Sequence, residues 1–410
     1  MLILFRFKNF RSFPDETFLD MRAVSYKEHP SHLAINDNKK ILKTLAVYGA
    51  NASGKTNLLF AMAHFHRFVS RQMFPETILY EDRFLFMPQM NLFDELSPFW
   101  SSAAEQMPTE MEMVFSCSGH TYEYGFSIIN RTVIKERFTA DHHLVFTREN
   151  RQLSFGRLYN KILRTKADIP VRENRLFCSV LSSMELAEIS NIMQPFETFF
   201  TSQINYYADF FEQARHKDTI YSYMHMFTLV ENRPALDFGL KNLNRFGIPI
   251  EDFILDHGIP KMGYRVRSRK TGEECIHYTD LQEVSEGTIK YLTLFEQIYT
   301  VFQKGGLLLI DNISNNFHPS VTKYVVDLFQ EKHNQNAQLI FTTYDISILN
   351  NQQFRRDEVA LVDMDEYHES RLYTLADIKV RSDASFSKDY LLGKYGGVPL
   401  LRDEPADSVD

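Results

Sequence analysis

Apolar and polar positions along the chain predict an alternation of strands and helices. Residues 2–10 alternate and continue as an apolar, aromatic strand pattern, and residues 42–48 form a second β-like run that ends at Gly49. Residues 55–69 then carry apolar side chains at helical spacing, so the first recognisable unit is a strand, a glycine-rich loop and a helix. Residues 111–138 have the pattern of strands joined by a turn. The amino-terminal part is therefore expected to mix α and β structure.

The second half of the chain repeats this alternation with more apolar strands. Buried strands are predicted at residues 305–311 and 337–343, and helices at residues 285–302 and 319–331. A strand over residues 355–365 would complete the same core. Because strands that are apolar at nearly every position are covered on both faces, the sequence predicts an α/β fold with a parallel sheet between helices.

The middle of the chain has a different pattern. Residues 150–240 lose the strand alternation and gain helical periodicity, but they are too few and lack the sustained heptads of a long coiled-coil arm. They are therefore expected to contain a helical insertion between two lobes, with an acidic tail at the end. The predicted amino-terminal lobe, insertion, carboxyl-terminal lobe and tail are residues 1–140, 141–245, 246–400 and 401–410.

The composition and charge are those of an ordinary globular protein. Hydrophobic residues make up 44% of the 410 residues and charged residues 24%, which argues against a disordered or fibrous chain. The 45 basic and 53 acidic side chains give a net charge of −8, so any contact with nucleic acid or anionic lipid must be local. The three scattered cysteines favour a reducing compartment. Because Arg6 and Lys8 interrupt the apolar start and no window approaches the about 18 apolar residues of a membrane span, we expect a cytoplasmic protein without a signal peptide or transmembrane helix.

The sequence GANASGKT at residues 49–56 has the form G-x-x-x-x-G-K-T of a phosphate-binding loop, between a predicted strand and a predicted helix. Backbone N–H groups of residues 51–55 would surround a β-phosphate, Lys55 would reach the β- and γ-phosphate oxygens, and Thr56 would hold Mg²⁺. An ordinary glycine turn before a helix is the alternative, but all eight positions and both flanks agree with the phosphate loop. The candidate nucleotide-binding residues here are Gly49, Asn51, Ser53, Gly54, Lys55, Thr56 and Asn57.

Two downstream segments contain residues that could also bind a nucleotide with its Mg²⁺. Asp311 stands at the carboxyl end of the predicted strand GGLLLID, where an acidic side chain can hold the Mg²⁺ of a nucleotide through water. Ser285 and Gly287 stand at the beginning of a predicted helix, whose N-terminus could bind a phosphate. A plain N-cap is the alternative explanation for that helix start.

Together and in this order, these motifs resemble the ABC-class ATPases of the SMC and DNA-repair type. They resemble more closely the compact ATPases of bacterial abortive-infection and anti-phage loci that are related to the overcoming-lysogenisation-defect proteins. The resemblance covers most of the chain, though residues 140–280 only weakly, and it rests on FKNFRSF (7–13), YGANASGKTNLL (48–59), SEGTIKYL (285–292), LLLIDNISNNFHP (307–319), QLIFTTYDISIL (338–349) and SKDYLLGKYGGVP (387–399). It implies an ABC-type P-loop ATPase head with a mostly parallel core sheet, an antiparallel β portion and a helical insertion.

The resemblance also implies ligands, partners and further site residues. ATP and Mg²⁺ would be the ligands, and two subunits would meet head to tail around each nucleotide. Ser285 and Gly287 would then contact the γ-phosphate held by the other subunit, and Arg11 would lie near the phosphates or the adenine. Gln89 would be the glutamine that senses Mg²⁺ between the lobes.

Two positions depart from the family pattern, and both act on the chemical step. Asn312 follows Asp311 where the family has the glutamate that acts as general base, and an amide cannot take up a proton at neutral pH. Tyr344 follows two threonines where the family has a histidine that contacts the γ-phosphate. Because loss of a general base costs about 10²- to 10⁴-fold in rate, nucleotide binding with slow or absent hydrolysis is expected. Glu286, Asp345 or another carboxylate could do the same work instead.

The function expected from these features is a nucleotide-gated clamp or scaffold in a bacterial anti-phage system. It would act as a homodimer or larger assembly and control an effector, such as a nuclease or toxin, encoded nearby. The alternatives are an active ABC-class ATPase that processes DNA together with a nuclease, and a nuclease regulator that contacts nucleic acid directly. Residues 131–176 hold 11 Lys/Arg against 5 Asp/Glu, and residues 264–270 add four cations, so each stretch could face nucleic acid or be a solvated basic face.

Overall fold

The strand that leads into the phosphate loop lies inside a six-stranded sheet. The computed structural model describes residues 1–37, 39–74, 98–99, 106–164, 171–184, 186–206, 229–315 and 317–399. The sheet has the order β11-β15-β16-β5-β17-β18, and its strands are β5 (Thr44–Tyr48), β11 (Ile204–Tyr206), β15 (Gly306–Ile310), β16 (Ala337–Thr342), β17 (Val359–Met364) and β18 (Ser370–Thr374). Neighbouring strands are parallel except for the edge pair β17 and β18. This sheet confirms the predicted α/β fold with a mostly parallel core.

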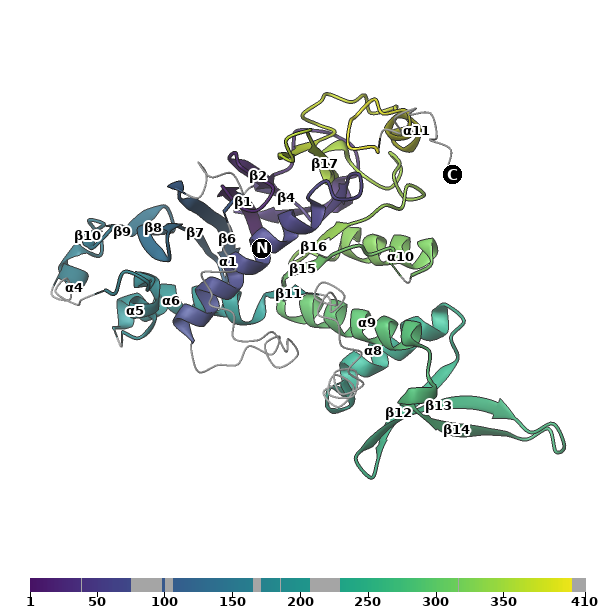
Figure 1. Cartoon of the computed structure of the whole chain (residues 1–410). Coiled ribbons are helices and arrows are strands. Elements are labelled where there is room, and N and C mark those ends of the chain that lie inside the picture. Colours follow the sequence, from purple (N-terminus) through teal and green to yellow (C-terminus); the bar gives the residue numbers. More distant parts are fainter. Residues whose placement is uncertain are drawn as a thin grey trace, which may run out of the picture.

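Side chains of this sheet alternate between two hydrophobic cores. In β5, Leu45 and Val47 belong to the core that contains α1 (Lys55–Met73), whereas Ala46 and Tyr48 belong to the other. The second core includes the helices α8 (Arg233–Arg245), α9 (Glu286–Lys304) and α10 (Pro319–Gln330), of which α8 and α9 lie side by side in Figure 1. Because both faces are covered, every residue of β5, β15 and β16 is buried, as expected for parallel strands.

A seven-stranded antiparallel sheet packs against α1 and corresponds to the predicted antiparallel portion. Its order is β10-β9-β8-β7-β6-β1-β2, and its strands are β1 (Leu2–Lys8), β2 (Thr17–Asp20), β6 (Thr109–Cys117), β7 (His120–Ile129), β8 (Thr132–Ala140), β9 (His143–Glu149) and β10 (Gln152–Phe155). Phe65 of α1 stacks on Phe126 of β7, with ring centroids 5.3 Å apart. Such aromatic contacts fix the helix that follows the phosphate loop against this sheet.

The stretch expected to be helical is helical only in part. The helices α4 (Asn160–Leu163), α5 (Phe177–Ser182), α6 (Ala187–Ser202) and α8 lie within it. β10, however, forms a strand there, because main-chain pairing with β9 extends the antiparallel sheet. The sequence also gave no signal for the three-stranded sheet β12 (Ile250–Asp256), β13 (Ile259–Arg267) and β14 (Glu274–Asp280). In β14 the side chains are exposed or half-buried on both faces, so no apolar alternation marks it as a strand.

The remaining elements are short and connect the larger ones. They are η1 (Pro30–His32), β3 (Leu33–Asn36), β4 (Lys39–Leu42), η5 (Leu281–Glu283), η6 (Arg356–Glu358) and α11 (Phe386–Leu391). Within the described ranges, no helix combines the length and the apolar character that crossing a membrane requires.

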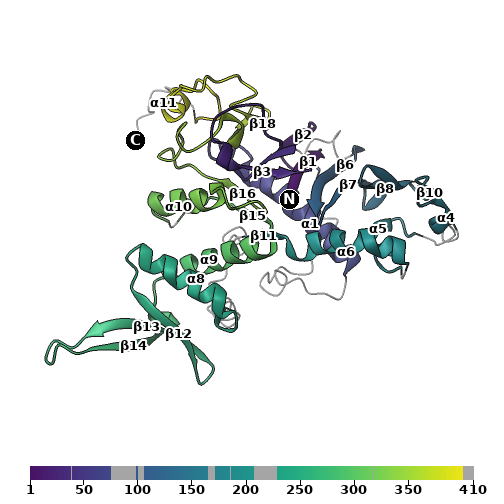
Figure 2. The ribbon, with the colours of Figure 1, turned by 180° about the vertical axis from the view of Figure 1, so that it is seen from behind.

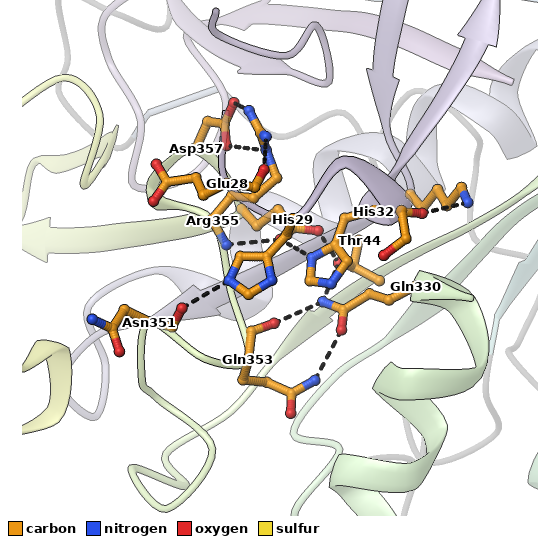
Figure 3. Close-up of polar contacts among 12 residues, drawn as sticks. Glu28, His29, His32, Thr44, Gln330, Asn351, Gln353, Arg355 and Asp357 are labelled. Atoms are coloured by element: carbon orange, nitrogen blue, oxygen red, sulfur yellow. Dashed lines mark hydrogen bonds and ion pairs between the residues drawn. The ribbon is translucent and has the colours of Figure 1, made fainter. Parts of the chain in front are cut away.

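A buried polar network surrounds the start of β5 and joins residues 32 and 44 to residues 330, 353 and 358 (Figure 3). The fully buried Glu358 carboxylate accepts from Thr44 Oγ1 at 2.6 Å and lies 2.7 Å from His32 Nδ1. Gln330 Nε2 donates to Thr44 Oγ1 at 3.1 Å, and Gln353 Nε2 donates to Gln330 Oε1 at 2.9 Å. Because Thr44 opens β5, this network positions the strand that presents the phosphate loop.

Candidate nucleotide-binding site

The phosphate loop runs from the end of β5 to the start of α1, and two of its glycines are required by the surrounding space. A Cβ atom on Gly49 would lie 2.3 Å from the carbonyl oxygen of Val362. A Cβ atom on Gly54 would lie 2.3 Å from Ser370 Oγ, and the φ of Gly54, +107°, is one that other residues rarely adopt. Both glycines therefore allow β17 and β18 to approach the loop closely.

Lys55 is held inside this loop. Its ammonium donates to the carbonyl oxygens of Gly49 at 2.9 Å and Ala50 at 2.7 Å, and only 4% of the residue is exposed. The centroid of the Tyr344 ring lies 4.0 Å from the same nitrogen. Burial lowers the pKa of Lys55 to about 8, although the charge of Asp311 opposes this shift. Lys55 is thus a desolvated cation at the place where a phosphate loop needs one.

Asp311 directly follows β15 and contacts the first turn of α1. Thr56 Oγ1 donates to Asp311 Oδ2 at 2.8 Å, and Thr342 Oγ1 donates to Asp311 Oδ1 at 2.5 Å. Thr342 Oγ1 also accepts from the backbone N–H of Asn312 at 2.6 Å. Thr342 is not among the predicted site residues. Its place at the carboxyl end of a buried parallel strand, where such sites gather, is the signal that could have found it.

The two positions that depart from the family pattern border the same site. Asn312 has a φ of +52°, a left-handed conformation that asparagine adopts more readily than most residues. Tyr344 lies two residues beyond β16, is 47% exposed and covers the ammonium of Lys55. Burial raises the pKa of the Tyr344 hydroxyl, and the Asn312 amide does not titrate, so neither side chain accepts a proton near neutral pH.

Asp345 is the alternative base whose side chain the structure describes. Its Oδ1 accepts from the N–H of Ser347 at 2.8 Å, and its buried Oδ2 has no hydrogen-bond partner in the described part of the chain. Asp345 thus keeps one unpaired acceptor within the described ranges, and its role as the base stays a prediction. Gln89 and the side chain of Glu286 lie outside what the structure describes.

Arg11 is brought to the first turns of α1. Its Nη1 donates to Asn57 Oδ1 at 3.4 Å, and its guanidinium carbon lies 4.4 Å from the Phe60 ring centroid. Asn57 Nδ2 in turn donates to Ser12 Oγ at 2.9 Å. Ser370 Oγ donates to the carbonyl oxygen of Ser53 in the phosphate loop at 2.8 Å and lies 2.8 Å from Ser12 Oγ. Sequence reasoning missed Ser12 and Ser370 because 358 positions separate them in the chain.

The residues present fit a nucleotide with its magnesium ion. Ser53 is buried in the loop with an Oγ atom that has no hydrogen-bond partner within the described ranges, and Asn51 is exposed at the outer side. The N-terminus of α1 adds free N–H groups and the positive end of a helix dipole. Thr56 and Asp311 supply a hydroxyl and a carboxylate, the oxygen ligands that Mg²⁺ prefers. The loop and Lys55 would hold the phosphates, and this pair would hold the metal ion.

The predicted signature residues form the N-terminus of α9. Ser285 is the N-cap residue, and its hydroxyl makes its hydrogen bonds with Thr288, at 3.2 Å to the backbone nitrogen and 2.8 Å to Oγ1. Within a single chain, Ser285 therefore acts as an ordinary N-cap residue, which was the alternative explanation for this helix start. Among the described residues, an added Cβ on Gly287 would meet only Ser285 Oγ, at 4.0 Å. This helix start thus stands beside open space, where a group from outside the chain has room.

The two basic stretches differ in how their charges are placed. In residues 131–176, Lys135 lies directly opposite Glu149, Arg151 lies 2.6 Å from Glu173, and Arg148 is fully buried. In residues 264–270, by contrast, every side chain after Tyr264 is exposed. The first stretch therefore includes a buried cation and an ion pair among cations that are mostly exposed, whereas all four cations of the second are exposed on β13 and the turn after it.

The parallel sheet, the phosphate loop after β5 and the carboxylate after β15 define a P-loop domain of the ATPase type. Residues 208–350 match the profile of a protein family described as "AAA domain, putative AbiEii toxin, Type IV TA system". This match confirms the predicted resemblance to the abortive-infection type of P-loop ATPase.

Two solved SMC head structures are similar to this chain over most of its length. "Crystal structure of the SmcHead bound to the C-winged helix domain of ScpA" is 13% identical, with a TM-score of 0.39 over 92% of this chain and 99% of that chain. "SMC head domain from Thermotoga maritima" is 14% identical, with a TM-score of 0.36 over 91% of this chain and 98% of that chain. A search of curated proteins finds no match.

Proposed function

We propose that the protein is an ATP-binding, nucleotide-gated clamp or scaffold of a bacterial abortive-infection system. The phosphate loop holds ATP with its magnesium ion, and hydrolysis is slow or lost. The chain works as a homodimer or larger assembly and controls an effector, such as a nuclease or toxin, from a neighbouring gene. The family description, which names an AbiEii toxin and a toxin–antitoxin system, supports this setting.

One contrast within the site carries the proposal. Lys55, Thr56 and Asp311 are the residue types that hold phosphate and metal in a P-loop site, and Thr56 lies beside Asp311. Asn312 and Tyr344 stand where the family has its general base and its γ-phosphate histidine. Because a general base contributes about 10²- to 10⁴-fold to rate, a site that keeps binding but lacks the base favours a long-lived bound state.

The helix start at Ser285 and Gly287 supports the assembly. The N-terminus of α9 carries free backbone N–H groups and a positive dipole end, both suited to a phosphate. The open space beside Gly287 leaves room for a nucleotide that a second copy brings. Two copies would thereby enclose each nucleotide between the phosphate loop of one and the α9 N-terminus of the other.

Nucleotide binding and turnover of the purified protein test the proposal directly. The wild-type protein should retain or trap intact ATP and turn over well below about 1 s⁻¹. Lys55→Ala should lose about tenfold or more in ATP affinity, because it removes charge-assisted phosphate contacts. Lys241→Ala, at an exposed position of α8, is the matched control and should bind as the wild type does. Turnover of about 1 s⁻¹ or faster would instead favour the active ATPase that acts on DNA, with Asp345 as base.

The role of a partner is tested in cells. Bacteria that carry this gene with its neighbour should survive phage as a population, and the Lys55→Ala variant should abolish that protection. The neighbouring product alone, or this chain alone, should give none. Full protection by this chain alone would contradict control of an effector.

A further inference from the structure

The β13–β14 hairpin extends beyond the small sheet to which it belongs. β12 pairs with β13 only between Ile259 and Tyr264, whereas β14 pairs with β13 as far as Arg267. Residues 265–276 therefore form a two-stranded ribbon closed by a turn. Every residue of this ribbon is exposed, and Figures 1 and 2 both show it projecting away from the rest of the molecule.

The ribbon is basic although the whole chain is acidic. It carries four cations and two carboxylates, namely Arg265, Arg267, Arg269, Lys270, Glu273 and Glu274. Arg265 is tied to Glu251 of β12 at 2.8 Å, and Arg267 Nε lies 4.0 Å from Glu274. At the tip, Arg269 and Lys270 make no ion pair with any residue that the structure describes. Two cations are thus left for a partner at the end of the arm.

Hydrogen bonds give the tip a defined shape. The N–H of Ser268 donates to the carbonyl of Glu273 at 2.9 Å, and the N–H of Gly272 donates to the carbonyl of Ser268 at 2.9 Å. Gly272 has a φ of +74°, which closes the turn in a conformation that suits glycine. Arg269 and Lys270 therefore stand on a preformed turn, which lowers the entropy that binding costs.

Nothing within the described chain explains why the ribbon is formed. An isolated two-stranded hairpin is marginally stable in water, and this one leaves Val266 38% and Ile276 46% exposed. A segment that leaves this much of its apolar surface exposed contributes little to the core. Its projecting shape and its charge are those of an element that binds another molecule.

We propose that this ribbon binds duplex DNA, with Arg269 and Lys270 on backbone phosphates and the strands in the major groove. The major groove is about 12 Å wide and admits a two-stranded β-ribbon. The cations at the tip complement the phosphates that border the groove, and a hairpin that projects clear of the core can reach between them. The acidic net charge confines the attraction to this arm. The inference does not depend on the nucleotide function proposed above.

Fluorescence anisotropy with a labelled DNA duplex of random sequence tests the proposal on the full chain. The double variant Arg269→Glu, Lys270→Glu should bind at least about tenfold more weakly than the wild type, and its salt dependence should lose about one unit of slope per phosphate contact. The matched control is Arg157→Glu, Lys161→Glu, which reverses two exposed cations of the other basic stretch. It should stay within about twofold of the wild type, since exposed charges away from the contact act only through the screened long-range field.

A second measurement needs no substitution. Cys275 lies in the ribbon and is exposed, whereas Cys117 and Cys178 are buried, so alkylation of the native protein reports on Cys275. Saturating duplex DNA should slow this alkylation by about tenfold or more if the strands enter the groove. Duplex RNA should protect less, because its major groove is too deep and narrow to admit a ribbon.

Three results would overturn the proposal. The first is absence of DNA binding by the wild type at about 50 mM salt, where phosphate contacts are strong. The second is an equal loss of affinity in the ribbon variant and the control variant. The third is protection of Cys275 by RNA equal to that by DNA, or protection only by a partner protein, which would assign the ribbon to another ligand.

Discussion

The ammonium of Lys55 lies 4.0 Å from the centroid of the Tyr344 ring, so this side chain covers the cation of the phosphate loop. A phosphate that reaches Lys55 must displace this ring or share the cation with it. Cation–π contacts are worth about 0.5–2 kcal/mol. In the proposed nucleotide site, Tyr344 would therefore oppose phosphate binding modestly, in addition to lacking the chemistry of an imidazole.

Removing the Tyr344 ring should tighten nucleotide binding. Tyr344→Ala is expected to raise the affinity for ATP by about 2- to 30-fold, the equivalent of a lost cation–π contact of about 0.5–2 kcal/mol. Tyr344→Phe keeps the ring and is the matched control, with an affinity close to that of the wild type. Calorimetric titration measures both. Weaker binding in Tyr344→Ala would show that the ring supports the nucleotide instead.

Nucleotide affinity should fall as the pH rises above about 8. Burial lowers the pKa of Lys55 to about 8 in the free protein, whereas bound phosphates favour the charged form and raise its pKa. Binding then takes up a proton above that pH, so the affinity should drop by up to about tenfold per pH unit. Lys55→Arg keeps its charge throughout and should give a flat profile. A flat profile for the wild type across the same range would contradict this role for Lys55.

Restoring a carboxylate at position 312 should raise ATP turnover. Asn312→Glu is expected to approach a gain of about 10²-fold if the site still orders an attacking water, and adding Tyr344→His should increase turnover further. A residue at position 312 must adopt the φ of +52°. For residues other than asparagine and glycine, this conformation costs about 1–2 kcal/mol. Asn312→Gln shares this strain without the base, so it should lose the same stability and gain no turnover. Equal turnover in the two variants would show that a missing general base does not limit the rate of ATP hydrolysis.

Bulk at Gly287 should block assembly without affecting a single chain. Because an added Cβ meets only Ser285 Oγ, at 4.0 Å, within the described ranges, Gly287→Arg should fold normally and bind ATP as a monomer. It should fail to form the ATP-dependent dimer, whereas Gly287→Ala should weaken that dimer less. Light scattering with and without ATP measures the difference. Loss of ATP binding by the Gly287→Arg monomer would mean that this helix start acts on the nucleotide of its own chain.

The buried network at the start of β5 should contribute strongly to stability. Glu358→Ala leaves the donors of Thr44 and His32 without their acceptor and should lower the free energy of unfolding by about 3–5 kcal/mol. Asp383→Ala removes one partner of an exposed ion pair with Arg381 and should cost no more than about 1 kcal/mol. Urea unfolding followed by circular dichroism compares them. Similar decreases in the free energy of unfolding in both variants would contradict the proposed contribution of Glu358 to stability.

The sequence by itself determined the features that depend only on residues next to one another in the chain. The eight residues of the phosphate loop predict phosphate binding by themselves, because this function requires a tight glycine turn, a lysine and a hydroxyl in succession. The helix from Lys55 and the strands that end near Tyr48, Asp311 and Thr342 follow from local apolar periodicity. The substitutions Asn312 and Tyr344 were visible for the same reason, since each lies within a short motif.

The tertiary structure alone decided which of these residues meet. Thr342 holds Asp311 because β16 lies beside β15, and Tyr344 covers Lys55 because β16 also lies beside β5. The order of strands in a sheet depends on long-range packing, which local periodicity does not encode. The sequence pattern did not predict the ribbon beyond Tyr264 either. Strands that are exposed on both faces lack the alternation of apolar and polar residues that marks a half-buried strand. Their pairing is made by backbone hydrogen bonds, which any sequence can form and which only the folded chain reveals.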